Sequence, residues 1–427
     1  MKNKLLRTTF LLIIGGMITK IFSLIIKITL TRHISTNTLG QYMTIYPTFI
    51  LLISISQFGL PTAMSKLVSE ENRNKKRFVF SNLPILAILN ILMMILIFAL
   101  APTITKLLHN KELYLGVISI ALVIPFTSIS SLIRSYLFGT GKALPQVLSN
   151  TVESIIRLFL YSHYLPILVN KKVSYIICFL ILSNVVCELS SIFTLMIFLP
   201  KRVNLRKKDF IPNIQEVKDY LQIGIPSTIT TITGSIAYFL EPIILLNTLK
   251  FIGYPNSFIN EEYGIITGYV IPLILLPSFF TQAISTALLP SISKDYSINN
   301  IKKVKLKLRF GILLSLIIGG ISTSLFILYP TMFLNTIYHT NKGINYIRIM
   351  SPFFLFLYIS FPISTTLDAI GKSKEHMKTI INSTIIRTIL LLILSLFHIG
   401  LYSLIISTCI NIIYTTISDY KKLKNNL

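Results

Sequence analysis

Repeated apolar runs of about 20 residues are the feature that most constrains how this chain can fold, because that length matches a helix crossing a bilayer. About 12 such runs, separated by polar breaks, occupy most of the 427 residues. With 53% hydrophobic and 13% charged residues, the chain is too apolar for a soluble domain. The sequence predicts an all-α polytopic membrane protein. The runs begin near Thr8, Tyr42, Phe78, Leu113, Ala143, Val173, Lys218, Tyr263, Arg309, Ile344, Met377 and Leu401.

Positive charge is concentrated in alternate connections between these runs. The connections on one side hold about 27 Lys and Arg, against about 7 on the other, which marks the richer side as cytoplasmic. Both termini then lie in the cytoplasm. The Lys and Arg residues that give the chain a net charge of +25 lie beside the apolar spans and do not form one basic domain. This pattern indicates contact with anionic membrane lipids and not with nucleic acid.

Enzyme and cofactor signatures are missing from the sequence. The G-T-G-K at 139–142 has Tyr136 where a phosphate loop needs glycine, and G-K-S at 371–373 fails in the same way. We interpret both as tight loops that lead into a helix. The three cysteines lie inside apolar runs without metal-site or disulfide spacing. We therefore expect no catalysis, no cofactor and no metal site.

The chain is predicted to consist of two halves. A basic segment at 201–217 separates a six-helix lobe at 1–200 from another at 218–427, and we expect it to be a cytoplasmic linker. Gly141 precedes Arg157 by 16 residues, and Gly371 precedes Arg387 by the same distance. These pairs are 230 positions apart, as a tandem duplication would place them.

Two lysines stand within the first apolar run. Lys20 and Lys27 are seven residues apart, close to two helical turns, so they share nearly one face. A central lysine costs about 2.5 to 3.5 kcal/mol on insertion, whereas each Leu, Ile or Phe contributes only about 0.3 to 0.6. We expect this polar stripe to face a water-filled interior. The alternative is that the side chains extend to the membrane surface.

Further charges lie in later runs. The four-residue spacing of Glu153 and Arg157 suits an ion pair within one helix, which is either structural or in contact with substrate. Glu188 is a candidate proton or ion site, with a structural role as the alternative. We expect Asp368 and Arg387 to pair across two helices.

The seventh run is a candidate moving part. Pro226 stands near its start, and Glu241 is followed by Pro242, which we expect to loosen the helix and free a carbonyl. A helix broken at both points would be able to bend. The gating or coupling candidates are therefore Glu241, Pro242, Pro226, Glu188, Glu153 and Asp368.

Five segments carry a resemblance that extends over the whole chain: G-Q-Y at 40–42, Q-F-G-L-P-T-A-M-S-K-L-V-S-E at 57–70, S-I-A-Y-F-L-E-P-I-I at 235–244, Y-G-I-I-T-G at 263–268 and L-P-S-F-F-T-Q-A-I-S-T-A-L-L-P-S-I-S at 276–293. The chain resembles the stage V sporulation protein B group of oligosaccharide-lipid flippases, in the superfamily that includes multidrug and toxin extruders. It departs from that group by having lysine where relatives often carry arginine, and by ending before two further helices.

The resemblance implies two six-helix lobes with pseudo-two-fold symmetry around a central cavity, in a bacterial cell membrane protein that acts as a monomer. Alternating access would move an undecaprenyl-diphosphate-linked saccharide outward, with lipid II during sporulation as the expected cargo. The substrate-binding candidates in a cationic cavity are Lys20, Lys27, Arg32, Arg157 and Arg387.

Physical reasoning favours the same mechanism, because an anionic diphosphate needs fixed cations to pass a low-dielectric layer. A cation-coupled multidrug antiporter is the alternative, and it would need a carboxylate on the first helix, where this chain has lysines. A receptor or scaffold would leave the embedded charges unexplained. The identity of the saccharide, and coupling to a monovalent cation or proton, stay open.

Overall fold

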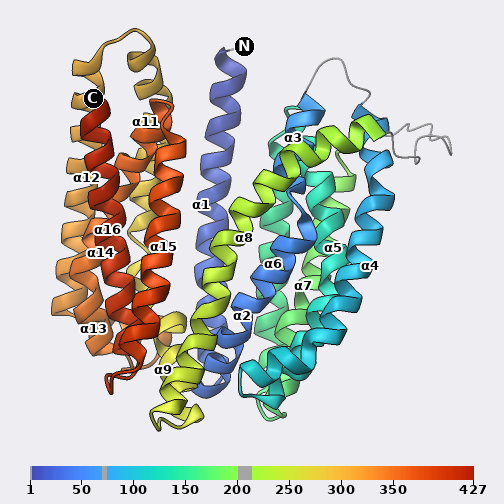
Figure 1. Cartoon of the computed structure of the whole chain (residues 1–427), viewed down its shortest axis with the longest axis vertical. Helices are drawn as coiled ribbons and strands as arrows, with labels where there is room; N and C mark the ends of the chain where they lie inside the picture. The colour runs from blue at the N-terminus through green and yellow to red at the C-terminus, as the bar shows by residue number, and fades with distance from the viewer. Residues whose placement is uncertain (1, 70–74, 201–213) are drawn as a thin grey trace. The chain divides into compact units, whose positions relative to one another are not determined.

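The computed structural model describes residues 2–69, 75–200 and 214–427, without the side chains of 2–14, 60, 75–80, 214–216, 223, 226, 227 and 230. That part of the chain forms helices joined by short turns and contains no strand (Figure 1). The protein is therefore all-α, as predicted. Contacts divide it into two compact units, Met1–Phe239 and Leu240–Leu427.

The first unit is built around α5. This helix packs against α2, α3, α4 and α7, while α6 packs against α1 and α7. A single turn of 3-10 helix at Lys111–Leu113 leads into α5. The helices are α1 (Lys2–His33), α2 (Thr36–Gln57), α3 (Leu60–Ser69), α4 (Lys75–Leu107), α5 (Tyr114–Gly139), α6 (Leu144–Leu168), α7 (Val173–Met196) and the first part of α8 (Ile214–Phe251).

The second unit is built in the same way around α14, which packs against α11, α12 and α16, while α15 packs against α16. A π-helical segment, η3 (Ile266–Val270), lies between its first two helices. The helices after the end of α8 are α9 (Asn256–Ile265), α10 (Ile271–Ile274), α11 (Ser278–Ser297), α12 (Ile301–Leu328), α13 (Pro330–Tyr338), α14 (Ile344–Ala369), α15 (Ser373–Ser395) and α16 (Tyr402–Asn426).

Two equivalent loops support the predicted duplication. Gly141 follows α5 and Gly371 follows α14, each with φ of +79°, a left-handed conformation that glycine adopts without steric cost. The Lys142 amide donates to the Leu137 carbonyl at 3.0 Å, and the Lys372 amide donates to the Leu367 carbonyl at 2.8 Å. Both loops thus close a helix with the same hydrogen bond, which confirms that they are tight turns leading into a helix.

Every predicted apolar run lies on a helix or a bent helix pair. Among the described residues, eight helical segments are long and apolar enough to cross a membrane, and α9 to α11, bent by 49°, form a ninth. The remaining runs lie on α1, α6 and α16, which carry charged side chains. The predicted starts of the apolar runs lie up to eight residues after the observed starts of the helices. The reason is that helices such as α12 begin in the polar segment before the apolar run.

The predicted breaks in the seventh run are wrong. The α8 helix is continuous from Ile214 to Phe251, through Pro226 and Pro242, although the side chain of Pro226 is outside the described part. Neither proline interrupts the helix, and a role of Pro226 and Pro242 in gating stays a prediction.

The α8 helix contributes to both units, because the boundary between them falls after Phe239. In its first part, the Tyr220 hydroxyl donates to the Phe58 carbonyl at 2.8 Å, at the break between α2 and α3 where Gly59 has φ of +67°. Most of the predicted linker at 201–217 lies outside the described residues, so division at that linker stays a prediction.

Candidate functional site

Lys20 and Lys27 lie on the continuous helix α1, so their predicted alignment on nearly one face is confirmed. Lys20 is exposed and Lys27 is half-buried. A different face of α1 packs against α6: a Cβ atom on Gly15 would lie 2.5 Å from Cγ2 of Val147. Packing of α1 on α6 therefore leaves the lysine stripe accessible.

The neighbours of the lysines on that stripe are small. Gly16 and Ser23 are exposed, and a Cβ atom on Gly16 would meet nothing within 4 Å. Arg32, near the end of the same helix, is also exposed. Between Lys20 and Arg32, the first helix thus presents three cations, and Gly16 and Ser23 beside the lysines leave room for a ligand.

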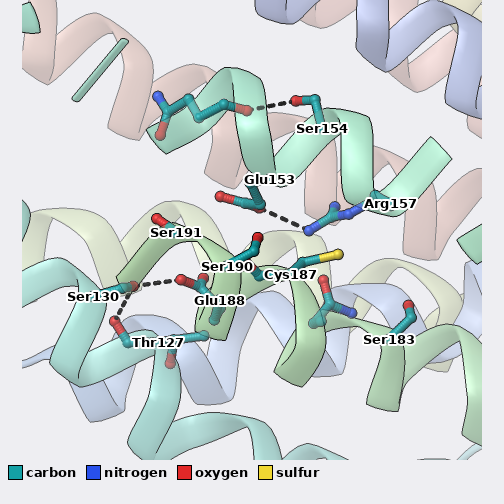
Figure 2. A network of polar contacts seen from close by, with 12 residues as sticks. Thr127, Ser130, Glu153, Ser154, Arg157, Ser183, Cys187, Glu188, Ser190 and Ser191 are labelled. Carbon is teal, nitrogen blue, oxygen red and sulfur yellow. Dashed lines mark hydrogen bonds and ion pairs between the residues drawn. The ribbon is translucent and has the colours of Figure 1, made fainter. Parts of the chain in front are cut away.

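A charged network joins α5, α6 and α7 inside the first unit (Figure 2). Arg157 donates to Glu153 at 2.8 Å, which confirms the predicted ion pair within α6. Arg134 on α5 lies 3.6 Å from the other oxygen of Glu153 and donates to Ser191 on α7 at 2.9 Å. One carboxylate therefore stands between two guanidinium groups.

Arg134 was not among the predicted site residues. It is a single cation within the apolar helix α5, which is the same signal that identified Lys20. The spacing of residues in the sequence could not show that Arg134 contacts Glu153, because Glu153 lies on a different helix, α6.

Glu188 on α7 is the second acid of this network, and its carboxylate accepts a hydrogen bond from Ser130 on α5. The neighbouring Asn184 donates to backbone carbonyls of its own helix instead. Figure 2 shows Cys187 beside Arg157. Glu188 thus differs from Glu153 in being hydrogen-bonded by a hydroxyl group, and its role as a proton or ion site stays a prediction.

A second buried ion pair lies inside the second unit. Arg387 on α15 donates to Glu241 on α8, and the Tyr263 hydroxyl on α9 donates to the other carboxylate oxygen at 2.9 Å. Glu241 is only 4% exposed. Both carboxylate oxygens therefore have donors, and three helices meet at this residue.

The predicted pairing of Arg387 with Asp368 is wrong. Asp368 is exposed in the last turn of α14, whereas Arg387 lies 14 residues into α15, about 21 Å along that helix at 1.5 Å per residue. The two side chains are at different depths, and Arg387 takes Glu241 as its partner.

Among the described residues, no group of three or more His, Cys, Asp or Glu side chains is placed to hold a metal ion.

Comparison with known proteins identifies the family. A family model described as "Polysaccharide biosynthesis protein" matches residues 5–296, and the model MatE matches residues 266–394. The chain belongs to the polysaccharide biosynthesis protein family. It is 28% identical over 405 residues to stage V sporulation protein B of Bacillus subtilis (strain 168), covering 92% of this chain and 78% of that protein.

This family member is also similar to a second Bacillus subtilis protein and to a solved structure. It is 21% identical over 429 residues to the lipid II flippase MurJ of Bacillus subtilis (strain 168), covering 91% of this chain and 77% of that protein. An inward-facing multidrug resistance MATE family transporter of the MOP superfamily superposes with a TM-score of 0.75 at 15% identity, covering 96% and 94% of the two chains. This chain and that transporter therefore share a fold.

Proposed function

We propose that this family member is a flippase that moves an undecaprenyl-diphosphate-linked saccharide across the cell membrane by alternating access. The observation that carries the proposal is the accessible stripe of Lys20 and Lys27 on α1. Its relatives include proteins named for lipid II flipping and for sporulation, which supports lipid II as the cargo and sporulation as the setting.

The lysine stripe supplies what a diphosphate headgroup needs. Moving such an anion through a layer of low dielectric constant is unfavourable unless fixed cations replace its hydration. An ammonium group donates three hydrogen bonds to phosphate oxygens, and Lys20 and Lys27 are about 10.5 Å apart along the helix. The polyprenyl tail can remain in lipid throughout, so only the head has to be shielded.

The ion pairs have a different role in this proposal. Arg157 and Arg387 each neutralise a carboxylate in the interior of a unit. We assign the first contact with phosphate to Lys20 and Lys27 because Lys20 is exposed and Lys27 is only half-buried on α1. The Arg387–Glu241 pair holds α15 and α8 in register, and the Arg134–Glu153 contact does the same for α5 and α6. We further propose that the protein acts as a monomer with both termini in the cytoplasm, and that it is not an enzyme.

One observation favours a second candidate, a cation-coupled transporter. Glu188 is hydrogen-bonded by Ser130, and we assign to it the coupling to a proton or a monovalent cation. Glu153 and Glu241 are less suited to this role, because arginine side chains already supply their counter-charge. Coupling at Glu188 is compatible with flipping, whereas export of cationic drugs is opposed by the lysines of α1.

The test is reconstitution of the purified protein into vesicles with labelled lipid II or a cationic dye. We expect lipid II to be flipped and the dye to remain. Lys20→Ala and Lys27→Ala should each reduce flipping sharply, and Lys27→Arg should largely preserve it, because arginine keeps the charge and adds planar donors.

The control for these variants is Lys378→Ala, which removes an exposed lysine near the start of α15 and should leave flipping unchanged. Removing an intramembrane cation eases insertion, so lost activity with normal protein levels would reflect function. Normal flipping by both alanine variants would show that the two lysine side chains only extend to the membrane surface and do not bind the substrate. Dye transport without lipid II flipping would establish the antiporter.

A further inference from the structure

The outer face of α16 carries a groove that the proposed transport mechanism does not use. It has a volume of about 380 Å³, at the lower end of the range for small-molecule sites. Its lining residues are Ile410, Ile413, Tyr414, Ile417, Ser418 and Lys421.

These side chains form one stripe along the helix, at spacings of three and four residues. The stripe is apolar from Ile410 to Ile417 and becomes polar at Ser418 and Lys421. Lys424 continues it by three residues. Both lysines are exposed, and within the described residues neither forms a hydrogen bond or an ion pair. The groove thus has an apolar body and a cationic end.

The opposite face of α16 holds the helix in place. Asp419 is fully buried and lies 2.7 Å from Nδ1 of His376 on α15, and the Thr416 hydroxyl is 3.2 Å from the Phe356 carbonyl on α14. Lys422 donates to the Glu375 carbonyl and the Thr379 hydroxyl, each at 2.7 Å. Because these contacts fix the rotation of α16, the groove stripe is held on the outside of the second unit.

The length of the groove decides between possible occupants. Ile410 and Lys421 are 11 residues apart, about 16.5 Å along the helix, which is close to half of a 30 Å hydrocarbon core. A single acyl chain of one leaflet fits that length, with its phosphate at the lysines. A long polyprenyl chain would exceed both the length and the volume.

We propose that this groove binds one anionic phospholipid of the cytoplasmic leaflet, with an acyl chain along Ile410, Ile413 and Ile417 and the headgroup phosphate on Lys421 and Lys424. Ser418 lies at the boundary between the two parts and provides a hydroxyl group for the ester region. This inference is independent of the cargo of the protein.

The test measures lipid binding to the full chain in detergent by native mass spectrometry. We expect one phosphatidylglycerol to bind with clear preference over phosphatidylcholine. Lys421→Ala/Lys424→Ala should lower the affinity roughly 30-fold, since each cation contributes about 1 kcal/mol near an anionic lipid surface. Ile417→Trp, which fills the groove and keeps both lysines, should also weaken binding.

The matched control is Lys303→Ala, which removes an exposed lysine near the start of α12 and should leave phosphatidylglycerol binding unchanged. An equal loss in this control would show that binding depends only on general charge, and equal affinity for phosphatidylcholine would show that the lysines do not take part. Binding of glycerol phosphate as strong as that of the lipid, or equal displacement by undecaprenyl phosphate, would also overturn the proposal. If Ile417→Trp does not accumulate in cells, the affinity of the double lysine variant for phosphatidylglycerol tests the proposal alone.

Discussion

Removing Arg387 should destabilise the second unit through the carboxylate that it neutralises. Glu241 is 4% exposed and is contacted by Arg387 and Tyr263. In Arg387→Met, a side chain of similar length leaves the carboxylate with one neutral donor. Removing one partner of a buried ion pair costs about 3 to 5 kcal/mol, which lowers the folding equilibrium constant by roughly two to four powers of ten.

Two further variants separate the ion pair from other effects of the substitution. Glu241→Gln leaves the guanidinium unpaired and should be destabilising for the same reason. Combining Glu241→Gln with Arg387→Met removes both charges and leaves an amide that still accepts from Tyr263, so the double variant should be more stable than Arg387→Met alone.

The assay is unfolding of the purified protein in mixed detergent and denaturant, followed by circular dichroism. Loss of the arginine eases insertion of α15 by about 2.5 to 3.5 kcal/mol, so a fall in stability reports the packed state and not insertion. Arg348→Met serves as the control, because Arg348 is exposed on α14 and its loss should change little. A double variant whose destabilisation equals the sum of the two single ones would refute the reasoning.

Two other predictions follow from the first unit and from the charge pattern. Gly59→Ala should destabilise the protein by about 2 kcal/mol or more, because Gly59 has φ of +67° and a Cβ atom there would lie 2.8 Å from Cα of Gly224. Gly141 has φ of +79° but open space around it, so Gly141→Ala should cost only about 1 kcal/mol. Equal melting temperatures of the two variants would contradict this prediction. A single cysteine at Asn37 should react with an impermeant thiol reagent in intact cells. A single cysteine at Lys207, which lies outside the described residues, should be protected. The reverse labelling pattern would show that the predicted topology is inverted.

Features that depend on local spacing could be predicted from the sequence. The all-α class and the order of the long helical segments follow from the apolar runs, because a helix in lipid must satisfy its backbone hydrogen bonds internally. The Glu153–Arg157 pair follows from i,i+4 geometry. The two glycine loops were predicted because glycine adopts a left-handed turn without steric cost. The alignment of Lys20 with Lys27 required only the helical period.

The continuity of α8 could not be predicted from Pro226 and Pro242. A proline removes one backbone donor and strains one turn, and neighbouring helices can stabilise the helix despite that local cost. Packing within the two units therefore decides whether such a helix breaks, and here it remains whole.

Only the tertiary structure determined which distant charges meet. Arg387 pairs with Glu241, 146 positions away, and Arg134 approaches Glu153 from another helix. Helical periodicity gives the direction of a side chain around its own axis, but not the rotation and depth of the helix beside it. Embedded charges could thus be found from the sequence, whereas their partners were fixed by packing, since a buried charge must be paired with whichever opposite charge the fold brings within reach.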